Sequence, residues 1–580
     1  IVFLPLLTLQ GLEGKLFAPV ALTIVFALSA SLLLSLTVVP VLAAWLLKRG
    51  KAHEPWLMKK LNTGYARLLD WALGHEKTVA VLAVVSLLAA AGAYLVVGKS
   101  FMPTMDEGDL IVQIEKLPSI GLDQTVAMDL RIQEAILKDV PEVADIVARV
   151  GSDELGLDPM GLNQTDTFLV LKPRKDWRKP DKEWLTDQLR ATLSGFPGIA
   201  FSFSQPIDMR ISEMMTGARG DLAVKIYGPD LKTLNGLAQD IEALLKKVPG
   251  AEDTLTVKND GVQYFRINID RLAAGRHGLN IEDVQADLRR LLEGQNIGTV
   301  MEQGRRVPLV IRGPEALRHS PADFAGLRIT TAAGDTLPLA SIASLERVDG
   351  PVKVDREAAQ RYVVVQSNVR GRDLVGFVDE ARQRVAQEIQ LPPGYRVAWG
   401  GQFENQQRAA ARLLVVIPIA LALIFFLLFS TFRSLRQTLL VLSNIPFALV
   451  GGIFALAMSG EYLSVPASVG FIALLGIAVL NGVVMVSYFN QLRDQGMSIQ
   501  QVVVEGAKRR LRPVLMTANI AAFGLVPLLF ASGPGSEIQK PLAIVVIGGL
   551  ASATLLTLLL LPLLYRRFGA SSTPAALEST

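Results

Sequence analysis

Long apolar segments occur in two groups along the chain, separated by roughly 300 residues of charged, mixed-pattern sequence. The apolar segments lie near residues 17–47, 79–97, 413–432, 437–458, 464–490, 514–532 and 541–565. Each is long enough to cross a bilayer, for which a helix needs about 20 residues. Residues 99–408 are too polar for lipid. The pattern therefore predicts a membrane α-helical bundle of about seven spans with a large water-exposed domain inserted between helices.

Basic residues flank the apolar segments and indicate an orientation. Clusters follow the first segment, separate later segments and follow the last one, as with Lys48, Arg49, Arg433, Arg436, Lys508, Arg509, Arg510, Arg512, Arg566 and Arg567. If all of them face the cytoplasm, the spans alternate without conflict, as the positive-inside rule requires. We therefore expect the inserted domain to lie outside the cytoplasm.

Residues 54–73 have an amphipathic pattern. Helical spacing puts one set of apolar residues on a single face: Leu57, Leu61, Tyr65, Leu68 and Ala72. The pattern indicates a helix in the cytoplasmic membrane interface. A helix packed on the protein's own bundle would have the same pattern, so both interpretations stay open.

Composition excludes some kinds of site. The 580 residues include no cysteine, so this chain has no disulfide and no thiolate metal site. The net charge is +4, and the basic residues form no single stripe that would indicate nucleic-acid binding. The chain begins at Ile1 inside an apolar run, without an initiator Met, a charged leader or a cleavage site. This is not a signal peptide, and we expect an upstream portion.

The middle domain repeats a strand–helix rhythm. Leu110, Val112 and Ile114 alternate as in a strand, and apolar residues at helical spacing follow near 128–136. The same order recurs from Leu222 and again from Tyr362. Units of this length predict an α+β domain with ferredoxin-like βαβ subdomains. We expect transmembrane helices over 1–98, subdomains over 99–217 and over 218–263 with 354–405, an insertion over 264–353, further transmembrane helices over 406–567, and a tail over 568–580.

Several motifs resemble those of resistance-nodulation-division (RND) exporters. These are SNIPFALVGG (443–452), GFIALLGIAVLNGVVM (470–485) and GAKRRLRPVLMT (506–517), which look like the family's ninth, tenth and eleventh helices. Three further stretches are similar to the heavy-metal efflux branch: FMPTMDEGDL (101–110), DPMGLNQTDTFLVLKPRKDW (158–177) and QPIDMRISEMMTG (205–217). The resemblance covers essentially the whole chain, as the C-terminal portion of such a protein.

The resemblance implies a fold and a function. The chain would begin at the end of the fifth helix and would hold helices six to twelve, two porter subdomains and a docking insertion. The protein would be an inner-membrane pump, with a large periplasmic domain, that exports heavy-metal cations in exchange for protons. It would be a homotrimer with a periplasmic adaptor and an outer-membrane channel. It would be no enzyme and would need no cofactor besides the transported metal.

Two other functions stay open. One is an RND exporter of organic or lipid-like compounds, which should line its cleft with aromatic residues; this chain is only 7% aromatic. The other is a non-transporting receptor or accessory protein on the same bundle. That class needs no docking domain, so the insertion at 264–353 counts against it.

Candidate metal ligands gather in QPIDMRISEMMTG. Its residues Asp208, Met209, Glu213, Met214 and Met215 combine carboxylates, which suit zinc-like ions, with thioethers, which suit Cu(I). In copper and silver exporters of the branch, three methionines form the site. The resemblance places Gln164, Glu213 and Asn296 at those positions, which favours Zn, Co, Cd or Ni over Cu or Ag. The alternative interpretation makes the methionines core filler and the carboxylates surface charge.

Three more acidic residues follow a span closely: Asp106, Glu107 and Asp109. They are candidates for attracting cations to a cleft entrance, and a solvated turn would have the same composition. The four histidines show no ligand spacing, so we assign none of them to metal.

The predicted apolar spans contain no Asp, Glu, Lys, Arg or His. The family's proton relay uses acidic residues on its fourth helix, which would lie upstream of Ile1. In multidrug members a lysine on the tenth helix assists, and the matching residue here is Leu480. Asn481 and Thr517 match relay-region positions. Neither carries a charge at neutral pH, so the alternative role is a hydrogen bond between helices.

Overall fold

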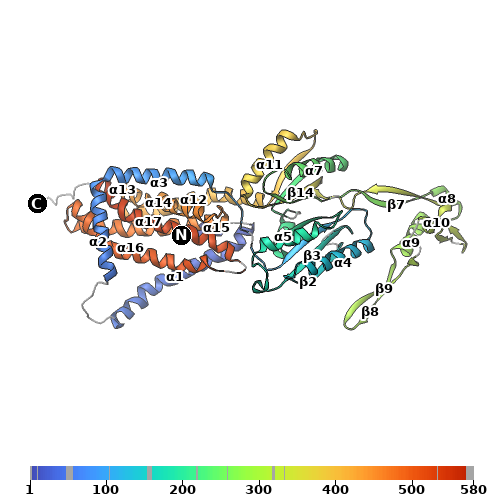
Figure 1. Ribbon diagram of the computed structural model, residues 1–580, viewed down its shortest axis with the longest axis horizontal. Coiled ribbons are helices and arrows are strands. Elements are labelled where there is room, and N and C mark those ends of the chain that lie inside the picture. Colours follow the sequence, from blue (N-terminus) through green and yellow to red (C-terminus); the bar gives the residue numbers. More distant parts are fainter. Residues whose placement is uncertain are drawn as a thin grey trace.

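The computed structural model describes residues 3–8, 11–46, 56–103, 105–152, 160–216, 220–257, 259–315, 321–331, 333–531, 533 and 535–569. Helices gather at one end of an elongated molecule, two α+β units lie in the middle, and a narrow arm of strands and short helices extends from the far side (Figure 1).

The helical end is built from both ends of the chain. Its elements are η1 (Leu4–Thr8), α1 (Gly11–Leu46), α2 (Trp56–Gly74), α3 (Glu76–Val96), α12 (Gln402–Phe432), α13 (Leu435–Leu442), α14 (Asn444–Ser459), α15 (Val465–Asp494), α16 (Ile499–Leu529) and α17 (Ser536–Phe568). Seven helical stretches among the described residues are long and apolar enough to cross a membrane, with α13 and α14 forming one of them. A membrane protein with an inserted α+β domain is therefore what the structure shows.

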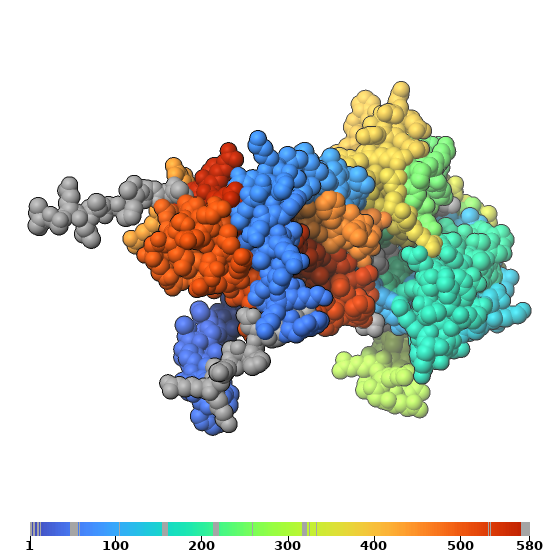
Figure 2. Space-filling model, turned by 60° about the vertical axis from the view of Figure 1, so that its left-hand side comes forward, coloured from blue at the N-terminus to red at the C-terminus, as the bar shows by residue number. Residues whose placement is uncertain are grey.

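The helix α1 begins earlier than its apolar segment. It starts at Gly11 and so includes Glu13 and Lys15, which precede the segment expected from residue 17. Glu13 is fully buried. The expectation that no ionisable residue lies in the spans was therefore too narrow, because burial against neighbouring helices extends past the apolar run. The second half of α1 is exposed and stands apart from the bundle in Figure 2.

The amphipathic helix α2 packs on the bundle with one face. Tyr65 and Leu69 are buried, and the Tyr65 hydroxyl donates to the Leu558 carbonyl of α17 at 2.8 Å. Leu61 and Leu68, which the sequence placed on the same face, are exposed instead. The packed face is therefore rotated relative to the predicted one. Packing on the bundle, one of the two interpretations, is therefore present, and a position in the membrane interface stays a prediction.

The first α+β unit follows α3. Its order is β1 (Leu110–Glu115), α4 (Leu122–Asp139), β2 (Val143–Val150), β3 (Gln164–Leu171), the short η2 (Arg174–Asp176), α5 (Lys182–Leu193) and β4 (Ala200–Ser204). The antiparallel sheet has the strand order β2-β3-β1-β4. Ile132 and Ile136 of α4 and Leu185 and Leu189 of α5 are buried on it, because their spacing of three or four residues puts them on one helical face.

The second unit is interrupted by an insertion. Its elements are β5 (Leu222–Tyr227), α7 (Leu231–Leu245), β6 (Ala251–Thr256), β13 (Arg356–Glu357), β14 (Gln360–Val369), α11 (Leu374–Glu388) and β15 (Arg396–Gly401). The sheet path is β13-β14-β5-β15, and β6 pairs with β14. Since α12 begins directly after β15, this unit is joined to the bundle without a linker.

The arm interrupts the second unit between β6 and β13. Its two long strands, β7 (Val262–Ile269) and β12 (Ala343–Gly350), pair with each other and carry the rest of the insertion. At its tip lie α8 (Arg271–Arg276), α9 (Ile281–Leu292), α10 (Pro321–Ala325), β10 (Arg328–Thr330), β11 (Thr336–Pro338) and η4 (Leu339–Ser341). A hairpin of β8 (Gln295–Glu302) and β9 (Arg305–Ile311) extends from this tip, and every residue in it is exposed (Figure 1).

Paired glycines bring α14 and α17 into close contact. A Cβ added to Gly451 would lie 2.2 Å from the Gly548 carbonyl oxygen, and one added to Gly548 would lie 2.4 Å from the Ala455 Cβ. The Ser552 hydroxyl donates to the Phe447 carbonyl at 2.9 Å across the same contact. Small residues permit such approach between membrane helices, where van der Waals contact and interhelical hydrogen bonds replace the hydrophobic effect.

We expect Gly451→Ala to lower the free energy of unfolding by about 1–3 kcal/mol, because the new methyl group meets backbone atoms that have no room to move. Gly524→Ala in α16 is the matched control, since an added Cβ there meets nothing within 4 Å. Thermal unfolding of the two variants in detergent checks the prediction. Equal melting temperatures would show that the contact between α14 and α17 is looser than described.

Candidate functional site

A short helix, α6 (Pro206–Thr216), lies between the α+β units and the bundle. The Glu107 carboxylate accepts hydrogen bonds from the backbone N–H groups of Ile207 at 2.5 Å and Asp208 at 3.0 Å. The first N–H groups of a helix have no partner within it, and a carboxylate there is stabilised by the helix dipole. The loop that follows α3 is therefore fastened to the start of α6, and this contact fixes Asp208.

Gln205 reinforces the same junction. Its side-chain amide donates to the Met105 carbonyl at 2.7 Å. Its oxygen accepts from the Glu107 N–H at 2.9 Å and from the Lys182 ammonium at 2.6 Å. Both polar ends of this buried side chain are satisfied, as a buried amide requires. Gln205 therefore holds the loop, α5 and α6 in one arrangement.

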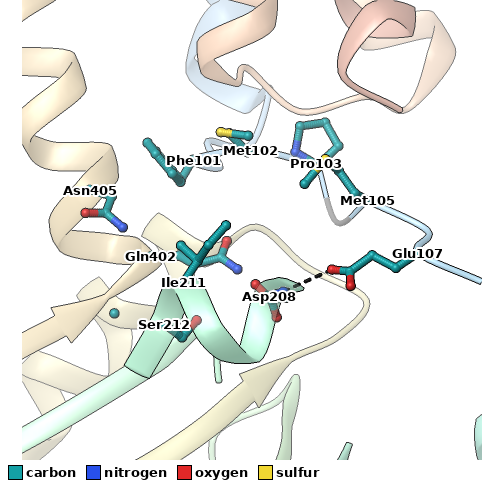
Figure 3. Close-up of a pocket in the computed structure, with 11 residues that line it drawn as sticks. Phe101, Met102, Pro103, Met105, Glu107, Asp208, Ile211, Ser212, Gln402 and Asn405 are labelled. Carbon is teal, nitrogen blue, oxygen red and sulfur yellow. Dashed lines mark hydrogen bonds between the residues drawn. The ribbon is translucent and has the colours of Figure 1, made fainter. Parts of the chain in front are cut away.

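A small cavity of about 50 Å³ lies under α6 (Figure 3). That volume is enough for a few water molecules or a partly hydrated ion. Carboxylate, thioether, amide and hydroxyl groups share its wall with apolar side chains; the lining residues are Phe101, Met102, Pro103, Met105, Glu107, Asp208, Ile211, Ser212, Gly401, Gln402 and Asn405. These groups offer both hard and soft donors to a cation.

A larger groove of about 370 Å³ lies between the two α+β units. Seven carboxylates line it, against three basic side chains; the acidic residues are Asp106, Glu183, Asp208, Asp221, Glu252, Asp253 and Glu537, and the basic ones are Lys182, Arg190 and Arg370. Met105 and Asp208 belong to both the groove and the cavity under α6. Asp208 therefore lies where the groove meets the cavity under α6.

The two walls of the groove are linked by ion pairs. Arg190 of α5 contacts Glu252 and Asp253 of the second unit, each at 3.1 Å. In return, Arg370 of the second unit contacts Asp187 of α5 at 2.8 Å. The Asp253 carboxylate also accepts a hydrogen bond from the Phe203 backbone N–H at 3.4 Å. The backbone of Asp253 has a positive φ of 48°. Apart from Asp253, these groups are partly exposed, so most of these contacts hold the units together with only a modest free energy.

The site shifts the proton affinity of its own groups. Burial, together with the negative charges of Asp221 and Glu107, raises the pKa of Asp208 to about 7. Burial also raises the pKa of Asp221, against the hydrogen bond from the Val369 N–H. Burial and the positive charge of Arg174 together lower the pKa of Lys182 to about 8, although nearby carboxylates oppose the shift. Asp208 thus changes its charge near neutral pH.

The three predicted entrance residues have structural partners. Asp106 contacts Lys182 at 2.8 Å and also pairs with Arg174. Glu107 caps α6, and Asp109 accepts from the Leu171 N–H at 3.0 Å. Asp106 lines the groove and Glu107 lines the cavity, whereas Asp109 lines neither. Their role in attracting cations stays a prediction.

The candidates on α6 fall into two groups. Met209 is 2% exposed, which fits the interpretation of core filler. The backbone of α6 continues through Glu213, Met214 and Met215, but their side chains lie outside the described residues. Of the predicted ligands on this helix, the structure therefore places only Asp208 at a cavity wall.

The predicted trio of Gln164, Glu213 and Asn296 is not brought together in this chain. Gln164 is buried in β3, where its side-chain oxygen accepts from the Gly161 N–H at 3.3 Å. Asn296 lies on the exposed β8–β9 hairpin at the end of the arm (Figure 1). An alignment position carries no spatial information across an insertion, which is why the sequence could not exclude this pairing. Among the described residues, no three His, Asp or Glu side chains gather closely enough to hold a metal ion.

The predicted relay-associated residues do meet. The Thr517 hydroxyl of α16 lies 3.1 Å from the Asn481 side-chain oxygen of α15, and 3.0 Å from the Val514 carbonyl. Asn481 is 3% exposed, and its amide nitrogen has no hydrogen-bond partner in the described part of the chain. Leu480 is 53% exposed. The amide nitrogen of Asn481 is therefore a buried hydrogen-bond donor that the contact with Thr517 does not use.

Sequence reasoning missed Asp221, Gln205, Met102 and Met105. Asp221 precedes an apolar strand, where an acidic residue ordinarily marks a turn. Met102 and Met105 lie in the quoted FMPTMDEGDL stretch, but only its carboxylates attracted notice. That stretch combines thioethers with carboxylates, as QPIDMRISEMMTG does. This combination could have identified Met102 and Met105 from the sequence.

We expect Asp208→Asn to flatten the pH dependence of divalent-cation binding. In the unaltered protein, affinity should rise with pH up to about 7 and fall by up to about tenfold per pH unit below it, because a proton competes for the carboxylate. Titration calorimetry with Zn²⁺ or Co²⁺ from about pH 5.5 to 8 measures this. Asp123→Asn on the exposed start of α4 is the control.

The raised pKa of Asp208 also determines how the stability of the folded protein depends on pH. The folded-state pKa of Asp208 lies above its unfolded value of about 3.9, so its contribution to stability is lost as pH rises towards 7. Asp208→Asn should therefore reduce the loss of stability between about pH 4 and 7. A variant that keeps the full pH dependence of both binding and stability would contradict this account of Asp208.

Comparison with known proteins identifies the family. The family model described as AcrB/AcrD/AcrF matches residues 1–569. The cobalt-zinc-cadmium resistance protein CzcA of Cupriavidus metallidurans is 41% identical over 98% of this chain and 54% of its own length. The cation efflux system protein CusA of Escherichia coli K12 is 33% identical over 97% and 55%. The chain thus spans about half the length of these relatives.

A solved structure agrees with these matches. The crystal structure of a heavy metal efflux pump superposes with a TM-score of 0.87 at 38% identity, covering 98% of this chain and 56% of that one. The agreement extends through the membrane helices, both α+β units and the arm, since almost the whole chain is covered. The chain belongs to the AcrB/AcrD/AcrF family of RND transporters.

Proposed function

We propose that the protein to which this chain belongs is a proton-driven exporter of divalent heavy-metal cations. The observation that carries the proposal is the position of Asp208, whose carboxylate lies between an acidic groove and a cavity that contains thioethers. Relatives named for cobalt, zinc and cadmium resistance support the choice of substrate. The groove collects cations from the periplasm, and Asp208 exchanges a proton for the cation.

The finer architecture is part of the same proposal. Both α+β units are ferredoxin-like, because each combines two helices with an antiparallel sheet in a strand–helix–strand order. All seven apolar helical stretches cross the inner membrane, with the units in the periplasm. The arm, with its exposed hairpin, docks a neighbouring subunit of a homotrimer. A periplasmic adaptor and an outer-membrane channel complete the exporter.

The donor set supports divalent ions over Cu(I) and Ag(I). Soft monovalent ions need several thioethers, whereas the groove between the units presents carboxylates. The only thioethers in the two cavity linings are those of Met102 and Met105. Glu213, an acidic residue where a thioether would serve Cu(I), adds to the preference. Export of organic compounds has little support, because each of the two cavity linings includes just one aromatic residue.

We expect the full-length protein to move Zn²⁺, Co²⁺, Cd²⁺ or Ni²⁺ across vesicles when a proton gradient is imposed. Ag⁺ and Cu⁺ should move at least about tenfold more slowly, since a carboxylate-rich site binds soft ions poorly. Fluxes of each metal, and of a hydrophobic dye, are compared in one preparation. Silver or dye transport without zinc, cobalt, cadmium or nickel transport would refute the proposed substrate class.

The contact between Asn481 and Thr517 positions the proton relay in this proposal. We expect Thr517→Ala to weaken proton coupling about two- to threefold, because an interhelical hydrogen bond in a membrane is worth about 0.6 kcal/mol. Metal binding in the periplasmic groove should not change. Thr431→Ala is the matched control, since its hydroxyl donates to the Leu427 carbonyl of its own helix at 2.9 Å.

The ratio of protons to metal ions in vesicles, together with equilibrium metal binding, separates the two roles. If both threonine variants behave alike, the Thr517 hydroxyl serves only its own helix, like that of Thr431.

A further inference from the structure

The side of α2 that faces away from the bundle exposes two tryptophans. Trp56 is 74% exposed and Trp71 is 44% exposed. Leu61 and Leu68, which lie beside them on the helix, are 42% and 41% exposed. Large apolar side chains that gather on one exposed surface usually mark a contact with a partner or a membrane. This side of α2 is therefore a candidate interaction surface.

Cations lie between the two tryptophans. Successive spacings of four, seven and four residues put one set of side chains on the same side of the helix: Trp56, Lys60, Arg67 and Trp71. The Lys60 ammonium lies 5.6 Å from the centre of the Trp56 ring. The exposed surface of α2 thus combines a basic stripe with an apolar flank.

The cations of α2 have no carboxylate partners. Lys59, Lys60 and Arg67 are exposed, and none of them forms an ion pair with another residue in the described part of the chain. Asp70 is the one acidic residue of this helix. Three cations against one carboxylate leave α2 with an excess of positive charge. An anionic ligand is therefore attracted without having to displace a partner within the protein.

Contacts on the opposite side fix α2 against the bundle. The Tyr65 hydroxyl donates to the Leu558 carbonyl of α17. Near the end of α17, the Arg566 guanidinium donates to the Leu73 carbonyl at 3.0 Å and pairs with Glu76 at the start of α3. The outward side is thus presented by a helix that is already folded and held. A ligand that binds there does not pay the entropy of ordering the helix.

The position of α2 along the bundle is that of a membrane surface. The helix crosses the end of the bundle that is farthest from the α+β units (Figure 1). Leu558 lies in the apolar part of α17, whereas Arg566 and Arg567 form the basic end of that helix. Contact with α17 therefore occurs where an apolar span gives way to cations. Tryptophan and amphipathic helices are favoured at this depth, between lipid headgroups and acyl chains.

The start of α16 adds positive charge at the same contact. Ala507 and Leu511 of α16 belong to the buried cluster that includes Tyr65 of α2. Lys508 and Arg512, which follow them in the sequence, form no ion pair with another described residue. Unpaired cations are thus present on both helices where α2 packs on the bundle.

The combination of side chains favours a phospholipid over other anions. A free phosphate ion would bind the cations and leave Trp71, Leu61 and Leu68 in water. A phospholipid offers its phosphate to the cations and its acyl chains to the apolar flank. The excess of positive charge favours a lipid with a net negative charge over a zwitterionic one.

We propose that α2 is a binding site for anionic phospholipid, in which Lys59, Lys60 and Arg67 contact the phosphates while Trp56 and Trp71 lie at the boundary between headgroups and acyl chains. Binding anchors the corner between α2 and α3 in the membrane. The site does not rest on the proposed function, because neither the groove nor the cavity under α6 is part of it.

Fluorescence quenching by brominated lipid tests the contact with α2. The full-length protein in a neutral detergent is titrated with brominated phosphatidylglycerol or with brominated phosphatidylcholine. Phosphatidylglycerol should quench at a concentration at least about tenfold lower, and the quenched fraction should fall in a Trp56→Phe/Trp71→Phe variant. Equal quenching by the two lipids, or no difference between the variant and the wild type, would overturn the proposal.

Removal of the three charges tests the role of the cations. The Lys59→Gln/Lys60→Gln/Arg67→Gln variant should bind phosphatidylglycerol at least about tenfold more weakly, since each Lys or Arg near an anionic surface contributes about fivefold. Its binding of phosphatidylcholine should not change. The melting temperature without lipid should equal that of the wild type, because the three side chains are exposed and unpaired.

A matched variant removes the same charge elsewhere. Lys138, Lys232 and Lys247 are exposed in the two α+β units, so Lys138→Gln/Lys232→Gln/Lys247→Gln should bind phosphatidylglycerol as the wild type does. The proposal is wrong if this control loses as much affinity as the α2 variant, or if the α2 variant loses none.

Inorganic phosphate distinguishes a lipid site from an ion site. At constant ionic strength, replacing chloride by inorganic phosphate should change phosphatidylglycerol binding by less than about twofold, because the apolar flank contributes to lipid binding alone. Complete displacement of the lipid by inorganic phosphate would show that the cations take a free anion, and the lipid site would be refuted.

Discussion

The contact of the Glu107 carboxylate with the first N–H groups of α6 holds the site together. It fastens the loop that leaves α3 to the helix that carries Asp208. Because α12 follows β15 directly, the second unit is attached to the bundle at a neighbouring point. The two attachments enclose the cavity under α6 between them (Figure 3). A charged cap at a helix start is worth more than a neutral one, and here it also determines a functional geometry.

The chemistry of this junction depends on its charged groups. The groove between the units concentrates carboxylates, yet most of them are compensated by Lys182, Arg190 and Arg370. Asp208 is different, because burial and two neighbouring carboxylates oppose its ionisation. Its surroundings therefore make this carboxyl gain and lose a proton near neutral pH.

In the helical bundle, too, specific contacts hold neighbouring elements together. Close contacts at Gly451 and Gly548 lock α14 against α17, and the hydrogen bond from Thr517 to Asn481 joins α15 to α16. Glu13 is buried near the Arg408 guanidinium, which donates to Asn405.

The sequence by itself determined the two groups of apolar helices, the repeated strand–helix rhythm, the interrupted second unit and the family, because local periodicity and length decide these features. It also indicated Asp208, Asn481 and Thr517 as candidates, whose roles stay predictions. Tertiary structure alone decided that Glu107 caps α6, that Asn296 lies far along the arm, and that Glu13 is buried beside Arg408. Those outcomes depend on contacts between residues up to about 400 positions apart in the chain, and no local pattern of hydrophobic and polar residues encodes them.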